Sequence, residues 1–477
     1  MASIWQVLSL VVIVLYILQQ LHNKFMKKKK ELPPGPKGFP IIGNLFMIGK
    51  NLHQDLYQIA KQHGPIMSMR FGLVPIIVAS SPHAAEQFLK KHDLVFASRS
   101  YNTAAQYIGY DQRNITFGKY GSYWRNMRKL CTLELLSSLK INSFQSMRKQ
   151  EIENFVTFLN RAASNGVEVD ISAKLASLSA NMACLMVFGK KLWMKNLMKG
   201  VLKMFDLQGF VPRMKKLAKI FDDLLEKIID EHVQDSKREN KQAKDIVDTM
   251  MAIMQSGEAE FEFDRRHVKA ILLDLLIASM DTASTAVDWT FTELLRHPKV
   301  MKKLQNELEQ VVGTNRMVEE SDLEKLEYLD MVIKEGFRLH PVAPLLIPHE
   351  SIEDCIVDGF DIPKGSRILV NTWAIGRDPE AWPEPEKFRP ERFVGSNIDL
   401  RGRDFQLLPF GSGRRSCPGL QLGLTIVRLV LAQLVHCFDW ELPNGMAPED
   451  LDMTEKFGLV TARFQHLVAI PTYRLHL

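Results

Sequence analysis

Residues 410–419 read Phe410-Gly411-Ser412-Gly413-Arg414-Arg415-Ser416-Cys417-Pro418-Gly419, a glycine-rich loop with one thiol, followed by an apolar, helix-like run. A thiolate stays ionised where positive charge and hydrogen-bond donors surround it, and glycine lets backbone amides approach the sulfur closely. An axial ligand of haem iron has these requirements, because the thiolate donates electron density to the metal. A lone cysteine is more often a buried structural residue. The paired glycines, the two arginines and the Pro-Gly pair favour the haem ligand instead.

This stretch resembles the haem-binding signature of the cytochrome P450 monooxygenases, and the resemblance runs from the N-terminus to Leu477. Residues 374–379 and 407–410 are most similar to plant microsomal (A-type) members. The resemblance implies a mainly α fold with small β-sheets, in which haem b (iron protoporphyrin IX) lies between a long central helix and the cysteine loop. It implies that Cys417 ligates the iron and that the rest of the loop binds the cofactor through Phe410, Gly411, Gly413 and Gly419.

Composition indicates one large domain. The chain has 477 residues, 46% hydrophobic and 24% charged, and no linker-like segment follows residue 50. The net charge of +6 owes much to Lys24 and the run Lys27–Lys30, so it does not indicate nucleic-acid binding. Five well-separated cysteines without CxxC spacing indicate neither a disulfide framework nor a zinc site, and they favour a cytosol-facing body. The sequon at Asn114 is interpreted as a chance match.

The N-terminus predicts a membrane anchor. Residues 1–21 are almost wholly apolar, enough for about one bilayer crossing, and the lysine cluster that follows favours a cytosolic C-terminal side. Residues 22–36 are interpreted as a basic stop and a stiff proline-rich hinge. The catalytic domain is then 37–477, on the cytosolic side of the endoplasmic reticulum membrane.

Hydrophobic periodicity predicts a mainly helical body. Short β-branched segments near Ile66 to Val78 and Ile368 to Thr372 indicate strands. The longest helical pattern starts near Phe263 and continues to Leu295, where His297-Pro298 stops it. The proline-rich segment from Pro379 to Pro390 predicts a meandering loop on the surface near Cys417.

Within the long helix, Asp281 and Thr282 set an acid beside a hydroxyl in an apolar stretch. Reductive splitting of dioxygen consumes protons, and such a pair can relay them. Alternatively, Thr282 bonds its own helix and Asp281 faces solvent; the presence of Cys417 favours the relay. The resemblance also aligns the pair with the family's acid-alcohol motif, in which Ser279 replaces a usual glycine.

Glu335 and Arg338 lie at i and i+3, where they can pair on one helix face. Alone, such a pair is common and contributes little. Its position between the relay helix and the thiol loop matches the family order, which implies that Arg392 completes a structural network behind the haem.

The haem carries two propionates that need cationic or N–H partners. Trp124 and Arg128 share a helix face at i and i+4, and the same residues are also consistent with a basic surface helix. The family order favours both as propionate donors, together with Arg415 and His349.

Substrate contacts are expected from four mostly apolar segments that the resemblance places opposite Cys417: Tyr101 to Phe117, Ile277 and Ala278, Val342 to Ile347, and Leu459 to Thr461. Each is equally consistent with core packing. Between about 191 and 206 the chain is shorter than the resembled enzymes by several helical turns, in the region that forms their lid.

The leading hypothesis is a membrane-anchored haem-thiolate monooxygenase of plant specialised metabolism. It would insert one atom of O2 into an apolar small molecule, with electrons from an NADPH-cytochrome reductase flavoprotein, in contact with membrane lipid. One alternative is a haem isomerase or dehydratase of the same fold, against which the Asp281-Thr282 pair argues. The other is a catalytically impaired haem-binding isoform that results from the shortened segment.

Overall fold

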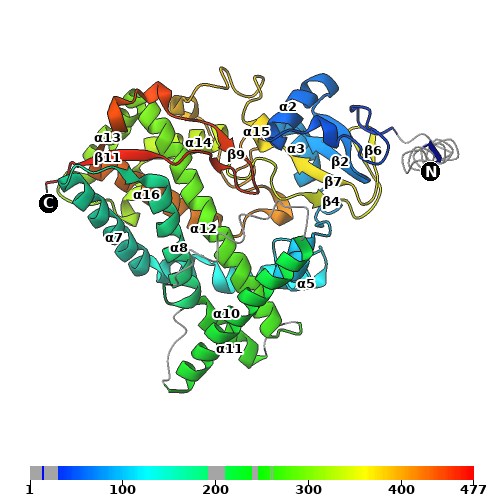
Figure 1. Cartoon of the computed structure of the whole chain (residues 1–477), viewed down its shortest axis with the longest axis horizontal. Helices are drawn as coiled ribbons and strands as arrows, with labels where there is room; N and C mark the ends of the chain where they lie inside the picture. The colour runs from blue at the N-terminus through cyan, green and yellow to red at the C-terminus, as the bar shows by residue number, and fades with distance from the viewer. Residues whose placement is uncertain are drawn as a thin grey trace, which may run out of the picture.

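The computed structural model describes residues 31–191, 210–238, 245–257 and 261–476, together with 13, 14 and 259. Within these ranges the chain forms a mainly helical body with four small β-sheets (Figure 1). The predicted mainly α fold is therefore confirmed. The predicted anchor at 1–21 and the shortened segment at about 191–206 lie outside the described residues, except for 13, 14 and 191.

Helix α12 (Arg265–Arg296) runs through the centre of the molecule (Figure 1). Its 32 residues span about 48 Å at a rise of about 1.5 Å per residue. Asp264 caps the first turn of α12 by accepting from the backbone N–H groups of Arg266 and His267. The helix ends at Arg296, and His297, the residue before Pro298, is its C-cap. The helix predicted from near Phe263 to the His297-Pro298 stop is confirmed.

Some of the other helices pack against α12, and others lie beside the largest sheet (Figure 1). The α-helices are α2 (Leu52–His63), α3 (Pro82–Glu86), α4 (Thr103–Ile108), α5 (Ser122–Leu130), α6 (Ser138–Ser143), α7 (Gln145–Ser164), α8 (Ile171–Phe188), α10 (Phe210–Arg238), α11 (Ile246–Ser256), α13 (Pro298–Val312), α14 (Glu327–Leu339), α15 (Thr372–Ile375) and α16 (Leu420–Cys437). Short 3-10 or π segments are η1 (Leu45–Met47), η2 (Gln87–Lys91), η3 (Cys131–Leu135), η4 (Glu320–Lys325), η5 (Pro390–Phe393), η6 (Gly413–Arg415), η7 (Pro443–Gly445) and η8 (Pro448–Asp450).

Three of the described helices, α8, α12 and α16, are long and apolar enough to cross a membrane. Each has more than half of its apolar window buried inside the body, at 56%, 67% and 61%. Packing in the core therefore accounts for their composition.

The largest sheet has the strand order β1 (Ile66–Phe71), β2 (Val74–Ala79), β7 (Arg367–Val370) and β4 (His349–Glu350). Strands β2 and β7 are parallel and the other neighbours are antiparallel. The smaller sheets pair β3 (Val169–Asp170), β11 (Val468–Tyr473) and β8 (Phe438–Glu441); β5 (Cys355–Val357) and β6 (Phe360–Ile362); and β9 (Glu455–Lys456) and β10 (Ala462–Arg463).

The two predicted strand segments differ in detail from the structure. The first is a hairpin, because Gly72 has a φ of +61° and turns the chain between β1 and β2. The second is β7, which ends at Val370, since Thr372 already belongs to α15.

The end of the proline-rich hinge is fixed against β1. The backbone N–H of Ser68 donates to the carbonyl of Pro34 at 2.8 Å. A Cβ on Gly35 would come within 1.8 Å of the carbonyl oxygen of Ser68, so only glycine fits there.

The core is divided along α12. The N-terminal half of the helix buries Val268, Ile271 and Leu272 in one hydrophobic cluster with α8, α10 and α11. The C-terminal half buries Phe291 and Leu294 in a second cluster with α13, α14 and α16. Because both ends of α12 are packed in this way, the middle of the helix is held rigidly in place.

A buried charge network ties the meander to α14. Arg338 donates from Nε and Nη2 to the carboxylate of Glu335 at 2.7 and 2.8 Å, and Arg392 Nε donates to the same carboxylate at 2.9 Å. Arg338 Nη1 also donates to the carbonyls of Gly376 and Pro385. The predicted set of three residues thus lies together in the interior.

The same helix lies directly against α12. A Cβ on Gly336 would come within 2.3 Å of Thr290 Oγ1, so α14 and α12 approach each other at a glycine. The meander, α14 and α12 therefore form one packed unit.

We predict that Glu335→Ala lowers the free energy of unfolding by about 3–5 kcal/mol, because it leaves two buried guanidinium groups without their carboxylate. Glu327→Ala, at an exposed position in the first turn of α14, should stay within about 0.5 kcal/mol of wild type. Denaturant titration followed by circular dichroism measures both. Equal losses in the two variants would contradict the assigned network.

Candidate functional site

A cavity of about 300 Å³ lies between the middle of α12 and the Cys417 loop. One wall consists of Ala278, Thr282, Ala283 and Ala286 on α12, and the opposite wall of Phe410, Gly411, Cys417, Pro418 and Gly419. Most of the remaining lining is apolar and includes Ile115, Leu136, Met186, Val342 and Leu346. The cavity is thus a mainly apolar chamber with one thiol in its floor.

The Cys417 loop is shaped by close backbone approaches. Gly411 and Gly413 have φ values of +66° and +67°, and a Cβ on Gly413 would meet the carbonyl oxygen of Leu89 at 2.4 Å. The N–H of Cys417 donates to the carbonyl of Phe410 at 2.8 Å, which closes the turn beneath the cavity.

Cys417 lines the cavity, and its side chain is accessible in this structure although protein surrounds it closely. Burial raises its pKa, and the N–H of Gly419 and the charge of Arg128 oppose this only in part. The sulfur therefore needs a further positive charge within the cavity to be a stable thiolate, which a coordinated metal ion supplies.

The predicted cationic residues meet at one edge of the cavity. Arg415 lies 3.9 Å over the ring of Trp124 and donates to the carbonyls of Ala97 and Gly118, both at 2.6 Å. Arg128 donates to the carbonyl of Ser416 at 2.6 Å. Both arginines line the cavity, as does Trp124.

Trp124 and His349, which were predicted to bind the propionates, form hydrogen bonds with backbone carbonyls in this structure. Trp124 Nε1 donates to the carbonyl of Ile115 at 2.9 Å. Nδ1 of His349 lies 2.8 Å from the carbonyl oxygen of Phe96, and the His349 side chain also lines the cavity. Burial lowers the pKa of His349 well below its usual value, so the ring is neutral at pH 7.

Arg99 is a cavity residue that sequence reasoning missed. It is 4% exposed and donates to the carbonyls of Ile347 and Pro348 at 2.5 and 3.0 Å. Burial, together with the nearby charge of Arg415, lowers its pKa well below the usual value. In the sequence, Arg99 follows Phe96-Ala97-Ser98, a short stretch without a periodic pattern, so nothing local indicates that it lies in a cavity.

Arg99, Arg128 and Arg415 form no ion pair with a carboxylate in the part of the chain that the structure describes. Burial and the neighbouring charge of Arg128 lower the pKa of Arg415 to about 9. Such a cluster is stable where an anion compensates it. A flat apolar molecule with two carboxylates at one edge and a metal ion above the thiol satisfies every one of these groups, and haem has that form.

The comparison with known families agrees with this geometry. The sequence model of the family described as "Cytochrome P450" matches residues 33–468. The chain belongs to the cytochrome P450 family.

Its relatives include plant cytochromes P450 of nearly equal length. The chain is 50% identical to cytochrome P450 CYP736A12 of Panax ginseng, with 94% of this chain and 95% of the relative covered. It is 40% identical to cytochrome P450 71AP13 of Prunus mume, with 97% and 94% covered. A solved zebra fish cytochrome P450 with abiraterone superposes with a TM-score of 0.79 at 28% identity, covering 90% of this chain and all of the other.

These findings confirm the family resemblance. The protein is an A-type plant cytochrome P450, a monooxygenase with haem as its cofactor, and it has the mainly helical fold of that family.

The acid and the alcohol of the P450 relay motif lie on different faces of α12. Thr282 lines the cavity, and its hydroxyl donates to the carbonyl of Ala278 at 2.8 Å. Asp281 lies outside the lining and is half-buried, and burial raises its pKa. Ser279 also faces the cavity, and its hydroxyl donates to the carbonyl of Leu275 at 2.6 Å.

The cavity lining corrects part of the expected substrate-contact set. The lining includes Ile115, Thr116 and Ala278, and from the segment Val342 to Ile347 it includes Val342, Ala343, Leu346 and Ile347. Tyr101, Ile277 and Leu459 do not, and all three are exposed at the surface. Thr461 is buried, but its backbone bonds Val342 and Trp289 instead of lining the cavity. A further unpredicted lining residue is Asp274 on α12.

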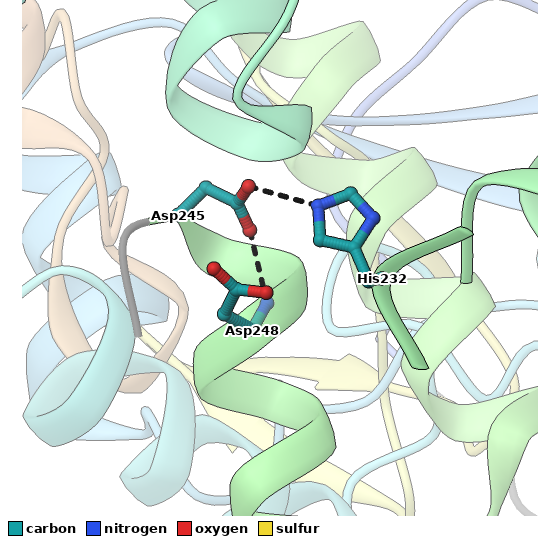
Figure 2. Close-up of side chains that lie close together, drawn as sticks. All are labelled: His232, Asp245 and Asp248. Carbon is teal, nitrogen blue, oxygen red and sulfur yellow. Dashed lines mark hydrogen bonds and ion pairs between the residues drawn. The ribbon is translucent and has the colours of Figure 1, made fainter. Parts of the chain in front are cut away.

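A second group of polar residues lies outside the cavity, where α10 meets α11 (Figure 2). His232 Nε2 lies 2.9 Å from one carboxylate oxygen of Asp245, and the other oxygen accepts from the N–H of Asp248. His232 Nδ1 lies 2.8 Å from the carbonyl oxygen of Ile228. Both ring nitrogens therefore face acceptors, which is the geometry of a protonated histidine in an ion pair with a helix cap, and no nitrogen is left for a metal ion.

We predict that Arg415→Met loses haem to an apomyoglobin acceptor roughly 10- to 100-fold faster than wild type, because one charge-assisted hydrogen bond contributes about 1.5–3 kcal/mol. Arg414→Met is the matched control, since Arg414 is exposed and pairs with Asp93 at the surface. Absorbance at the Soret band follows the transfer. Equal transfer rates for the two variants would show that the buried arginines do not hold the cofactor.

A second prediction concerns pH. The bond to Asp245 raises the pKa of His232 from 6.5 to about 9. The stabilisation is therefore fully present below about pH 6.5 and is lost as pH rises through 9. The stabilisation is on the order of 3 kcal/mol, at about 1.36 kcal/mol per pKa unit.

The difference in unfolding free energy between wild type and His232→Gln should accordingly shrink between pH 6.5 and 9.5. A chelator should leave the wild-type value unchanged. A difference that is constant over this range would contradict the ion pair.

Proposed function

We propose that this P450 inserts one oxygen atom from O2 into an apolar small molecule, with two electrons from NADPH delivered by a partner flavoprotein reductase. The second oxygen atom leaves as water, so each turnover consumes two electrons and two protons. The observation that carries the proposal is that Cys417 and Thr282 face one apolar cavity from opposite walls. When bound, haem supplies the reduction and splitting of O2.

The residues of this chain have separate roles in that reaction. Cys417 binds the iron, and Arg99, Arg128 and Arg415 bind the two propionates. The apolar wall of α12, with Ala278, Ala283 and Ala286, keeps bulk water away from the reacting face. The chain therefore orients the substrate and limits side reactions, while the cofactor carries the chemistry.

Thr282 delivers protons to the cavity. Its hydroxyl is committed to the carbonyl of Ala278, so it must rotate away from that carbonyl, or accept from a water molecule, to take part in a proton chain. Asp281 follows next to it in sequence and has a raised pKa, which suits a group that takes up a proton from solvent and passes it on.

The N-terminal sequence supports a location at the endoplasmic reticulum membrane. The apolar composition of residues 1–21 and the lysine cluster that follows are typical of a single-pass anchor with a cytosolic body. The hinge then joins the body at Pro34 and Gly35, which are fixed on β1. The reductase, an acidic flavoprotein, is attracted by basic residues on the thiol side.

We predict that Thr282→Ala lowers product formation by roughly 10²-fold, the lower end of what a positioned acid or base contributes, while NADPH consumption continues and hydrogen peroxide accumulates. Thr285→Ala on the same helix is the control, because Thr285 is buried away from the cavity. The assay uses the full chain reconstituted with reductase and a substrate found by difference spectroscopy among phenolics, terpenoids and fatty acids.

Two results would count against the proposed function. One is turnover that needs no reductase, as expected of an isomerase or dehydratase. The other is a wild-type reduced carbon monoxide complex without the strongly red-shifted Soret band of a thiolate-ligated haem, or a Cys417→Ser variant that keeps this band.

A further inference from the structure

Ser279 stands where the family usually has glycine, and the proposed reaction gives this side chain no role. It lines the main cavity between α12 and the Cys417 loop, and it also lines a second, small cavity of about 20 Å³. The small cavity lies between α7, α8, α12 and α16 (Figure 1). Both linings share Met186, Leu422 and Ile426 as well, so the two cavities are direct neighbours.

The small cavity contains a buried hydroxyl without a partner. Besides the shared residues, its lining consists of the apolar Met147, Met182 and Ala183 and of the polar Arg148 and Ser179. Ser179 on α8 is 6% exposed, and its hydroxyl forms no hydrogen bond within the part of the chain that the structure describes. Burying a hydroxyl in this way is unfavourable, so the small cavity is expected to hold a molecule that bonds it.

A single water molecule fits both the size and the polar groups of the small cavity. A buried space of about 10–15 Å³ or more can hold one water where several polar groups face it. The hydroxyl of Ser179 is free to donate. The oxygen of Ser279 can accept, because its own hydrogen is donated to the carbonyl of Leu275 at 2.6 Å. Arg148 uses three of its five N–H groups, on Glu320 and the carbonyl of Ile141, so it has two more to offer.

Ser279 connects this water site to the relay alcohol. Thr282 lies three positions further along α12, which places the Cβ atoms of the two residues about 5–6 Å apart on one helix face. Both residues line the main cavity, so one water molecule in that cavity can bond both hydroxyl groups. Asp281, in contrast, lies outside the lining and reaches the main cavity only indirectly.

We propose that the small cavity holds one water molecule between Ser179 and Ser279, and that this water supplies protons to Thr282 through Ser279. The water passes a proton to the oxygen of Ser279, and Ser279 passes its own hydroxyl proton to a water beside Thr282. Solvent next to Glu320, whose side chain is 15% exposed and pairs with Arg148, replaces the proton that has left. This inference rests on the proposed oxygen insertion, which consumes two protons in each turnover, and it adds a proton route to that of Asp281.

A purely structural role for Ser279 is the competing explanation, because its side chain also fills space where α8 and α12 pack together. Ser179 separates the two explanations. It lines the small cavity and not the main one, so its replacement leaves the wall of the main cavity intact. An effect of Ser179 on the reaction must therefore pass through the small cavity.

The first test is a crystal structure of the full-length, haem-loaded protein at a resolution that shows ordered water. We expect one water molecule in the small cavity, within hydrogen-bonding distance of both the Ser179 and the Ser279 hydroxyl oxygens. An empty small cavity overturns the proposal, and so does a water molecule that does not reach Ser279.

The second test measures how much of the NADPH consumed ends in product and how much in hydrogen peroxide, with the full chain and its reductase. Ser179→Ala and Ser279→Ala should each lower the ratio of product to peroxide roughly 5- to 10-fold, the effect of one lost hydrogen bond. The dissociation constant of the substrate should stay unchanged in Ser179→Ala. The double variant should resemble Ser279→Ala, because both changes interrupt the same chain.

Each variant has a matched serine on its own helix. Ser284 on α12 also donates to carbonyls of its own helix, those of Met280 and Asp281, but it lines neither cavity. Ser177 on α8 is exposed at the surface and donates to the carbonyl of Ala173. Ser284→Ala and Ser177→Ala should both keep the wild-type ratio of product to peroxide.

Two results of the second test overturn the proposed route: an unchanged ratio in Ser179→Ala, or a loss in Ser284→Ala as large as that in Ser279→Ala. The crystal structure needs neither a variant nor turnover, so a variant that fails to fold leaves the proposal testable. An unchanged ratio in Ser179→Ala with intact turnover refutes this route alone. A wild type that binds the water but forms no product refutes the oxygen insertion and not the water site.

Discussion

The fixed separation between α12 and the Cys417 loop is the constraint on which the rest of the molecule depends. On one side, α12 is held at both ends by separate hydrophobic clusters. On the other, the loop is held where Gly413 meets Leu89 and where Ser412 Oγ donates to the carbonyl of Gly402 at 2.6 Å. A cofactor of fixed thickness can be held between such walls because neither wall can collapse onto it.

The cations at the cavity edge show how the protein prepares for its cofactor. Arg99, Arg128 and Arg415 are tied to backbone carbonyls, which hold the guanidinium groups in place but do not neutralise them. Burial lowers the pKa of all three, and a neighbouring arginine lowers the pKa of Arg99 and Arg415 further, so keeping these charges buried has a cost. Haem binding relieves that cost, so cofactor affinity and fold stability are linked.

Short-range motifs were sufficient to predict much of this structure. The Cys417 loop, the extent of α12 and the Glu335–Arg338 pair could be predicted from neighbouring residues, and the family resemblance added Arg392 to the pair. Arg99 could not, because its importance comes from tertiary burial next to Arg415 and not from a local pattern.

The substrate wall illustrates a different limit. Ile277 was expected in the cavity and lies outside it, because it is one residue, about 100° of helix rotation, from Ala278. The same helical phase, followed back from Thr282 in steps of four, leads to Ala278 and then to Asp274. A stricter use of periodicity would thus have found the carboxylate from the sequence.

The close approach of Gly336 to Thr290 links the two faces of the haem site mechanically. The carboxylate of Glu335 holds the meander through Arg338 and Arg392, and the next residue presses backbone onto α12, two turns beyond Thr282. Only the short side chain of Thr290 lies at this contact, and it leaves little room to absorb a displacement. A displacement of the meander is therefore passed on to α12, the helix that forms the wall opposite Cys417.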